Sequence, residues 1–300
     1  MRQLDSARYP FFLTLAVYIL SSFALLGTTA ATPQQASTEA PETLPGRAHI
    51  SHLEWRNIGP AVTGGSIVEF AVVESDPLTI YAATASSGVW KTTNGGITWG
   101  PVFENENREA LGGIAVSRTN TNVVWFGTGE PNARNLRSSS WGDGVYKSED
   151  GGKTWANKGL RDSLQIGRIR IHPEDHNIVY VSAVGPLSAN DPERNAARGL
   201  FKTIDGGESW TKVLSVGEKT GIVDVVMDPR DPDILYAGAW QRERRDWSYV
   251  NVGPEGGIFL STDGGESWRK LSSGLPEGEV GRPGVTVCAS NPDTVYAVFE

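Results

Sequence analysis

Short apolar runs separated by polar turns repeat along most of this chain, and they predict β-strands. Runs such as IVEFAVV at Ile67, IGRIRI at Ile166 and IVDVVM at Ile222 are rich in Val and Ile and are bounded by Gly, Pro, Asn or Asp, which is typical of strands. No window after the N-terminal segment has the 3.6-residue spacing of a helix. We therefore predict an all-β protein, with no helix in the mature chain.

One phrase, GVYKSEDGGKTW (Gly144 to Trp155), occurs in four copies and defines a repeat. The other copies begin at Gly88, Gly199 and Gly257, so the repeat is about 56 residues long. Two apolar runs joined by a polar turn precede each copy, and the phrase itself predicts a third strand, a DGG turn and a fourth strand. Four antiparallel strands per repeat form the blade of a β-propeller.

The DGG turn is predicted to be structural. Its acid accepts hydrogen bonds from nearby amides, its glycines supply positive φ, and the Trp that follows buries a large face against the blade. The first copy has Asn94 in place of the acid, and an amide oxygen keeps much of that bonding. The predicted structural residues are Asn94, Trp99, Asp150, Trp155, Asp205, Trp210, Asp263 and Trp268.

The phrase resembles the Asp-box, or BNR repeat, whose pattern is Ser/Thr-x-Asp-x-Gly-x-Thr-Trp; SEDGGKTW from Ser148 to Trp155 fits it. Asp-boxes occur in sialidases, some glucan hydrolases, a photosystem-assembly factor and sortilin-type receptors. With the opening WRNIGPAVTGG at Trp55, the chain resembles bacterial exported proteins similar to the sortilin N-terminal region, which are often labelled glycosyl hydrolases. The resemblance covers residues 53–300 and implies a propeller, but the fold alone does not determine which reaction a protein catalyses.

The N-terminal segment is predicted to direct export. Arg2 and Arg8 precede an apolar run from Phe11 to Gly27, and small residues follow, so residues 1–31 have the pattern of a secretory signal peptide. An uncleaved membrane anchor is the alternative, because the run is near the shortest length that spans a bilayer. Residues 32–52 are polar and Pro-rich and are predicted to be a linker.

We predict a partial propeller over residues 53–300. The segment LEWRNIG (Leu53 to Gly59) matches KTWANKG (Lys153 to Gly159), which is a predicted fourth strand, so residues 53–59 are expected to close the last blade. The fifth copy stops within its second strand, and we therefore expect an incomplete ring of about four and a half blades. The predicted blades span residues 66–104, 112–160, 166–215 and 222–272, with a fifth begun at 282.

Composition excludes several classes of partner. The net charge of −8 and pI of about 5.2 argue against nucleic acid or anionic lipid, and contact with a membrane is expected only if the N-terminal segment is uncleaved. Cys288, the single cysteine, is predicted to be a small buried hydrophobe. His172 and His176 have a metal-like spacing but lie in a predicted turn, so we predict neither a metal nor a cofactor.

Three long insertions separate the predicted second and third strands, at residues 128–143, 183–198 and 239–256. Strand parity places all three on the rim opposite the DGG turns, and long loops on a rigid scaffold often carry function. Arg binds carboxylates or phosphates, and Trp stacks on sugars or peptide side chains. The alternative is that these side chains only hold the loops together. The candidate ligand-binding residues are Arg134, Arg137, Trp141, Arg198, Trp240, Arg242, Arg245 and Trp247.

Carboxylates for glycoside hydrolysis are present, but no spacing rule selects a pair. The candidates are Glu130, Asp143 and Asp224, and no sialidase-type Arg-Ile-Pro motif, G-x-S-x-G or H-E-x-x-H accompanies them. We therefore predict an exported, sortilin-like propeller that binds a peptide, protein or glycan on its long-loop face and is non-catalytic in this span. A secreted glycoside hydrolase of the Asp-box type is the alternative, and a structural or assembly role is a third.

Overall fold

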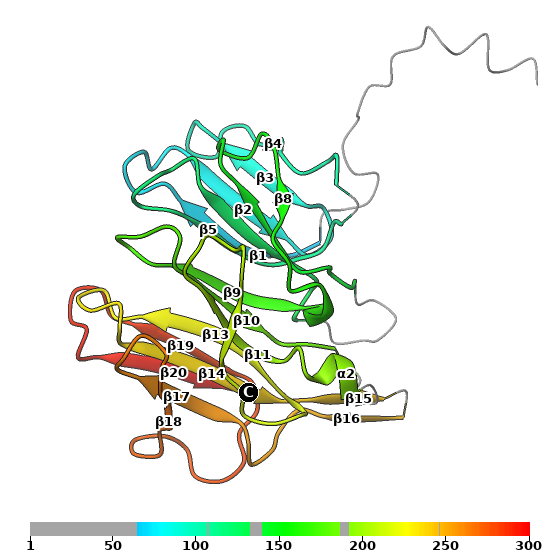
Figure 1. The fold of residues 1–300 in the computed structure, drawn as a ribbon, viewed down its shortest axis with the longest axis vertical. Coiled ribbons are helices and arrows are strands. Elements are labelled where there is room, and N and C mark those ends of the chain that lie inside the picture. The colour runs from blue at the N-terminus through cyan, green and yellow to red at the C-terminus, as the bar shows by residue number, and fades with distance from the viewer. Residues whose placement is uncertain (1–64, 107, 133–139, 187–191, 246) are drawn as a thin grey trace, which may run out of the picture. The chain divides into compact units, whose positions relative to one another are not determined.

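The computed structural model describes residues 65–300, apart from 107, 133–139, 187–191 and 246 (Figure 1). The predicted signal peptide, linker and closing strand lie outside the described residues. The chain divides into two compact units, Met1–Arg56 and Asn57–Glu300, and every described residue belongs to the second. In the described part of the chain, no helix has the length and apolar character needed to cross a membrane.

Four antiparallel sheets of four strands follow one another along the chain, each in the order of the sequence. The first sheet consists of β1 (Ile67–Val72), β2 (Ile80–Thr84), β3 (Val89–Thr92) and β4 (Gly100–Pro101). The second consists of β5 (Leu111–Val116), β6 (Val124–Thr128), β7 (Val145–Ser148) and β8 (Ala156–Asn157). The third consists of β9 (Ile166–Ile171), β10 (Val179–Ala183), β11 (Gly199–Thr203) and β12 (Thr211–Leu214).

The fourth sheet carries an extra hairpin, and a two-stranded fifth sheet follows it. The fourth consists of β13 (Thr220–Met227), β14 (Leu235–Gln241), β17 (Gly257–Ser261) and β18 (Arg269–Lys270). The hairpin is β15 (Glu243–Arg245) with β16 (Ser248–Val250), and the fifth sheet is β19 (Pro283–Val287) with β20 (Val295–Phe299). Two single helical turns lie in connections, η1 (Arg161–Ser163) and α2 (Pro192–Asn195).

Successive sheets pack against each other through their first strands: β1 contacts β5, β5 contacts β9, β9 contacts β13, and β13 contacts β19. These strands lie side by side in Figure 1. Four-stranded antiparallel sheets that meet in order through their first strands are the blades of a propeller. The prediction of an all-β propeller is therefore confirmed, and we call the sheets blades 1 to 5.

The hydrophobic core lies between blades rather than inside any one of them. Leu111, Ile114 and Phe126 of blade 2 pack with Tyr81 and Val89 of blade 1. Equivalent clusters join blade 2 to blade 3 and blade 3 to blade 4. The prediction that Cys288 is a small buried hydrophobe is wrong. Cys288 follows β19 and is partly exposed, and its Sγ lies 3.4 Å from Ser290 Oγ.

The DGG turns are closed by their own side chains. Asp150 Oδ1 accepts bonds from the amides of Lys153 and Thr154 at 3.0 and 2.9 Å, and its Oδ2 accepts a 2.6 Å bond from the Thr154 hydroxyl. Gly151 and Gly152 have φ of 72° and 90°, which an L side chain rarely adopts. Asn94 accepts the amide of Thr98 at 3.0 Å, so an amide oxygen serves in blade 1 as the acid does elsewhere.

The same turns also join neighbouring blades. Tyr81 of blade 1 donates its hydroxyl to the carbonyl of Gly151 in blade 2 at 3.0 Å, and Lys91 donates to that carbonyl at 2.9 Å. In the opposite direction, the indole of Trp155 donates to Val102 of blade 1 at 2.7 Å. We call the edge that carries these turns and the short turns between first and second strands the short-turn rim. The opposite edge, with the connections between second and third strands, is the long-loop rim.

Candidate functional site

The long loops of blades 2 and 4 and the connection between blades 2 and 3 meet at one buried side chain. Arg242 follows β14 of blade 4 and is fully buried. It donates to the carbonyl of Pro131 in the blade 2 loop at 3.1 Å, and to Gln165 Oε1, which precedes blade 3, at 2.5 Å. One arginine of blade 4 therefore holds the long loop of blade 2 and the connection that enters blade 3.

Arg198 has a similar role within the blade 3 loop. It is 1% exposed and donates to the carbonyls of Val184 and Pro186 at 2.8 and 2.5 Å. Trp240 is 3% exposed, donates its indole to the carbonyl of Asn251 at 2.9 Å, and lies 4.6 Å from the Arg242 guanidinium. These three predicted ligand-binding side chains are enclosed, and their donors are used to hold loops. They offer no surface to a ligand in this structure.

Burial makes the arginine charges costly. It lowers the pKa of Arg242 to about 9, with a further contribution from the neighbouring Arg198 charge. It also lowers the pKa of Arg198, to about 10. Arg242 Nε, Gln165 Nε2 and Asn132 Oδ1 are buried and have no hydrogen-bond partner among the residues that the structure describes. The structure therefore tolerates an unfavourable polar junction in order to place these loops.

Two other predicted binding residues face solvent. Trp247 lies between β15 and β16 and is 77% exposed, and Trp141 in the blade 2 loop is 41% exposed. Tyr249 of β16 is 39% exposed and packs under Arg244, whose guanidinium lies 4.8 Å from the ring. Large aromatic faces that the fold does not cover are suited to stacking on a ligand. Arg245 is paired with Glu243, and the predicted residues Arg134 and Arg137 lie outside the described residues.

The two candidate carboxylates on this rim differ in environment. Asp143 is 18% exposed and lies 3.5 Å from Arg108 and 3.6 Å from Arg161. It also accepts a 3.1 Å bond from the Tyr146 hydroxyl. Glu130 is partly buried, and that burial raises its pKa. A carboxyl with a raised pKa can serve as a general acid, whereas an ion-paired carboxylate stays charged.

The third candidate, Asp224, belongs to a chain of charges across the first strands. Asp224 Oδ1 lies 3.6 Å from Arg168 Nε, and Arg168 Nη1 lies 2.9 Å from Glu69 Oε1. Glu69 also pairs with Arg170 at 3.1 Å. Glu69, Arg168 and Asp224 occupy the same register position in blades 1, 3 and 4.

Glycines and bulges make this chain of charges possible. Gly113 and Gly284 occupy the equivalent position in blades 2 and 5. A Cβ on Gly113 would lie 3.2 Å from Glu69 Oε2, so glycine leaves room for that carboxylate. The register shifts next to this position in blades 1 to 4, and bulges of this kind re-aim side chains.

The charged first-strand residues do not form a hydrolytic pair. Arg168 occupies the space between Glu69 and Asp224, whose other oxygens accept the amides of Ile114 and Val285, each at 3.0 Å. A glycosidase needs open space for the sugar between its carboxyls. Sequence reasoning missed Glu69, Arg168 and Arg170, although a charge within an otherwise apolar strand was a visible signal.

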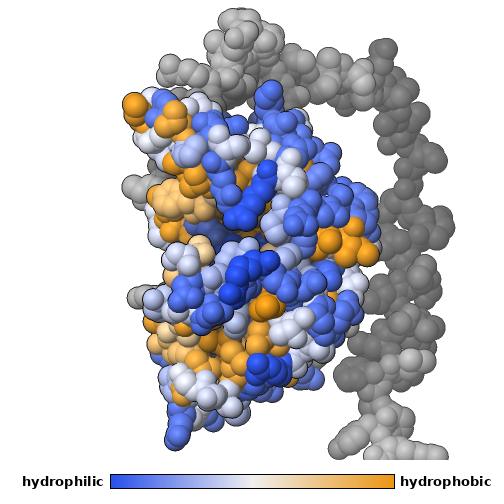
Figure 2. All heavy atoms as spheres, turned by 90° about the vertical axis from the view of Figure 1, so that its left-hand side faces the viewer, coloured by the Kyte–Doolittle hydropathy of each residue, from blue (hydrophilic) through white to orange (hydrophobic). Residues whose placement is uncertain are grey.

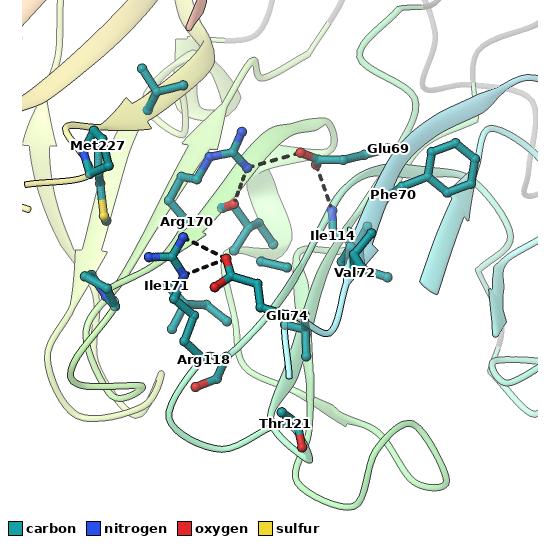
Figure 3. Close-up of a pocket in the computed structure, with 18 of the residues that line it drawn as sticks. Glu69, Phe70, Val72, Glu74, Ile114, Arg118, Thr121, Arg170, Ile171 and Met227 are labelled. Atoms are coloured by element: carbon teal, nitrogen blue, oxygen red, sulfur yellow. Dashed lines mark hydrogen bonds and ion pairs between the residues drawn. The ribbon is translucent and has the colours of Figure 1, made fainter. Parts of the chain in front are cut away.

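A groove of about 740 Å³ lies where the first strands reach the short-turn rim. Phe70, Val72 and Met227 give it apolar walls, and Glu74 pairs with Arg118 across its mouth at 2.7 Å (Figure 3). Figure 2, which faces this rim, shows hydrophilic side chains over much of the surface with hydrophobic patches among them. The volume suits a small ligand, but no pair of free carboxylates is directed into it among the lining residues.

Comparison with known proteins identifies the family. The profile described as sortilin, neurotensin receptor 3 matches residues 143–296, which is more than half of the chain. The chain belongs to the Sortilin-Vps10 family. This Sortilin-Vps10 chain is also 23% identical, over 77% of its length, to a xyloglucanase of a Paenibacillus species and to one of Acetivibrio thermocellus. It covers 23% and 28% of those two proteins, so it spans about a quarter of these relatives.

Solved structures similar to the Sortilin-Vps10 chain share its fold. An ancestral GH74 enzyme superposes with a TM-score of 0.57 at 19% identity, covering 77% of this chain and 28% of that one. The GH74 enzyme of Niastella koreensis superposes with a TM-score of 0.56 at 16% identity, covering 76% of this chain and 33% of that one. Identities this low establish the architecture alone.

Proposed function

We propose that this Sortilin-Vps10 chain binds a glycan on the exposed aromatic side chains of its long-loop rim and does not cleave it with residues of this span. The observation that carries the proposal is the 77% exposure of Trp247 at the turn of the β15–β16 hairpin. A large indole left in solvent by a rigid hairpin is costly unless a ligand covers it. The relatives named xyloglucanases favour a polysaccharide over a peptide.

The buried arginines support this role by fixing the loops that carry the aromatic residues. Arg242 joins the blade 2 and blade 4 loops, which are the loops that carry Trp141 and Trp247. A site held in place before the ligand arrives loses less conformational entropy on binding. The rim therefore has the rigid support and exposed stacking surface that glycan binding requires.

The rival function is glycoside hydrolysis by Glu130 as the acid and Asp143 as its partner. The raised pKa of Glu130 favours it. Against it, Asp143 is already engaged by Arg108, Arg161 and Tyr146, and a base or nucleophile must be free to act on water or sugar. We propose export as well, because residues 1–31 have the composition of a signal peptide.

The test is a binding assay with defined polysaccharides, including xyloglucan, on the purified chain. We expect Trp247→Ala to weaken binding by about tenfold or more, because exposed aromatic anchors dominate such contacts. Trp247→Phe should keep most of the affinity. Trp99→Ala, a tryptophan on the opposite rim that is 37% exposed, is the matched control and should bind as the wild type does.

Product analysis separates the two functions. We expect no new reducing ends after long incubation with any polysaccharide that binds. Hydrolysis that disappears in Glu130→Gln while binding persists would establish the rival function. Binding that is indifferent to Trp247→Ala would remove the aromatic rim as the glycan site.

A further inference from the structure

Two arginines on the long-loop rim have no carboxylate partner. Arg244 lies in β15, and Arg282 lies just before β19. In the part of the chain that the structure describes, neither guanidinium makes a hydrogen bond or an ion pair. The arginines on either side of Arg244 differ, because Arg245 is paired with Glu243 and Arg242 donates to blade 2 and to the connection before blade 3. The donors of Arg244 and Arg282 are therefore not used by the fold.

Both of these side chains lie over an aromatic ring. The guanidinium carbon of Arg244 is 4.8 Å from the centroid of the Tyr249 ring, and that of Arg282 is 5.6 Å from the centroid of the Trp240 ring. Both arginines are partly buried. Contact with an aromatic face orients a guanidinium and leaves its in-plane N–H donors free to bind a carboxylate bidentately. Each side chain is thus held in place with its donors available.

The β15–β16 hairpin and the start of β19 meet at the carbonyl of Asn251. The Trp240 indole donates to that oxygen at 2.9 Å, and a Cβ on Gly281 would lie 3.3 Å from it. Asn251 follows Tyr249 by two residues, and Gly281 immediately precedes Arg282. The two arginines that lie over aromatic rings therefore belong to one surface of the rim.

Positive charge on this surface is not fully balanced by acids. Burial lowers the pKa of Arg282, and the charge of Arg168 lowers it further, whereas the charges of Glu300 and Asp224 raise it. Asp224 is already ion-paired with Arg168, and Glu300 is exposed and is not ion-paired with Arg282. A bound anion would offset the repulsion between the arginines and would accept the donors that the fold leaves free.

The exposed indole of Trp247 lies next to these arginines along the hairpin. Trp247 immediately precedes β16 and comes two residues before Tyr249, a separation of about 7 Å along a strand. The register of the hairpin places Arg244 directly opposite Tyr249. A sugar unit that stacks on Trp247 therefore has its neighbouring unit within reach of Arg244.

We propose that the glycan recognised by this rim is acidic, and that Arg244 and Arg282 bind the carboxylate of a uronic acid unit beside the unit that stacks on Trp247. This inference rests on the proposed function, because it assigns the charge of the same ligand. A planar carboxylate accepts two parallel N–H bonds from one guanidinium. The chain carries a net charge of −8, so long-range attraction does not assist a polyanion and these local donors decide the selectivity.

The test compares two polymers that differ only in charge, polygalacturonate and its methyl ester, in a binding assay on the full chain. We expect polygalacturonate to bind at least about tenfold more tightly than the ester, because the ester cannot form charge-assisted hydrogen bonds. Arg244→Gln and Arg282→Gln should each remove most of that preference and leave the affinity for the ester unchanged. Arg118→Gln is the matched control on the short-turn rim, where the side chain is 54% exposed, and it should keep the preference.

Thermal unfolding separates a binding role from a structural one. Both substitutions should keep the wild-type Tm within about two degrees, since neither removes a hydrogen bond of the described fold. A preference for polygalacturonate that survives in the double variant Arg244→Gln/Arg282→Gln would overturn the inference. Tighter binding of a sulfated dextran than of polygalacturonate would overturn the assignment to a uronic acid.

The same assay distinguishes failure of this inference from failure of the proposed function. Equal affinity for the acid and its ester, with both weakened by Trp247→Ala, would overturn the inference and leave glycan binding on this rim standing. Binding to xyloglucan but to neither form of polygalacturonate would have the same meaning. Absence of binding to all three polysaccharides would overturn both.

Discussion

On the short-turn rim, each complete blade carries nearly the same turn, whereas on the long-loop rim the loops differ in sequence from blade to blade and that of blade 1 is much shorter than the others. The bond from the Thr154 hydroxyl to Asp150 and the bond from the Ser209 hydroxyl to Asp205 are both 2.6 Å long. Opposite them, one blade presents an exposed hairpin and another a helical turn. The repeated turns join neighbouring blades. The long loops differ from blade to blade and are therefore available to bind a ligand.

The two rims also differ in whether the surroundings of an ionisable side chain favour its charged form. The Ser267 hydroxyl and amide and the Ser261 hydroxyl hold the pKa of Asp263 down to about 2, so its local partners favour the charged form. Burial lowers the pKa of Arg242, so its surroundings disfavour the charged form. The turns of the short-turn rim therefore favour their charged groups, whereas on the long-loop rim the cost of burying the Arg242 charge is offset by the hydrogen bonds that position the loops.

The largest loss of stability should come from neither rim but from the contact between first strands. A Cβ on Gly112 would lie 1.6 Å from the carbonyl oxygen of Ile166 in the next blade. We expect Gly112→Ala to lower the free energy of unfolding by more than about 3 kcal/mol, because neither backbone can move without separating the blades. Urea unfolding followed by tryptophan fluorescence measures this.

Gly100→Ala is the matched control, because a Cβ there meets nothing within 4 Å. Its free energy of unfolding should stay within about 0.5 kcal/mol of the wild type. Equal effects of the two substitutions would mean that the close approach of blades 2 and 3 is not what limits stability.

The sequence predicted the blades because the repeated turn is local: every bond of the Asp150 turn joins residues within four positions of one another. It did not predict which arginines are buried, because Arg242 is bonded to Pro131 and Gln165, 111 and 77 residues away. The local sequence pattern does not show that Arg242 is buried whereas Trp247, five residues later, is exposed. The pairing of Glu69 with Arg168 also required the register of separate blades.

A smaller loss is expected from Arg242→Met, which tests whether the long-loop rim is held by this side chain. The substitution keeps much of the volume but removes two hydrogen bonds and leaves the Gln165 side chain and the Pro131 carbonyl without this donor. We expect the free energy of unfolding to fall by about 1–3 kcal/mol, together with weaker glycan binding. Differential scanning calorimetry and the same binding assay measure both effects.

Arg245→Met provides the comparison on the same loop. Arg245 is paired with Glu243 at a partly exposed position, so its loss should change stability by less than about 1 kcal/mol. A stabilised Arg242→Met protein that binds glycan normally would show that the buried arginine positions nothing on this rim.

The smallest effect should come from the acid of one short-turn-rim hairpin, seen as a dependence on pH. The folded state lowers the pKa of Asp263 to about 2, below its value of about 3.9 in an unfolded chain. The stability that this ionisation contributes is fully present above about pH 4 and is lost as the pH falls through about 2. We expect Asp263→Asn to lower Tm slightly at pH 7 and to flatten its decline between about pH 4 and pH 2.

Blade 1 provides the reverse substitution, because Asn94 already makes the turn with an amide. Asn94→Asp should raise Tm near pH 7 and steepen its decline in acid, since the new carboxylate would accept the Thr98 amide as Asp263 accepts that of Ser267. Opposite changes of slope in the two variants would show that each turn contributes independently. Identical slopes in both variants and the wild type would mean that acid unfolding starts elsewhere, with the ion pairs of the first strands as the next place to look.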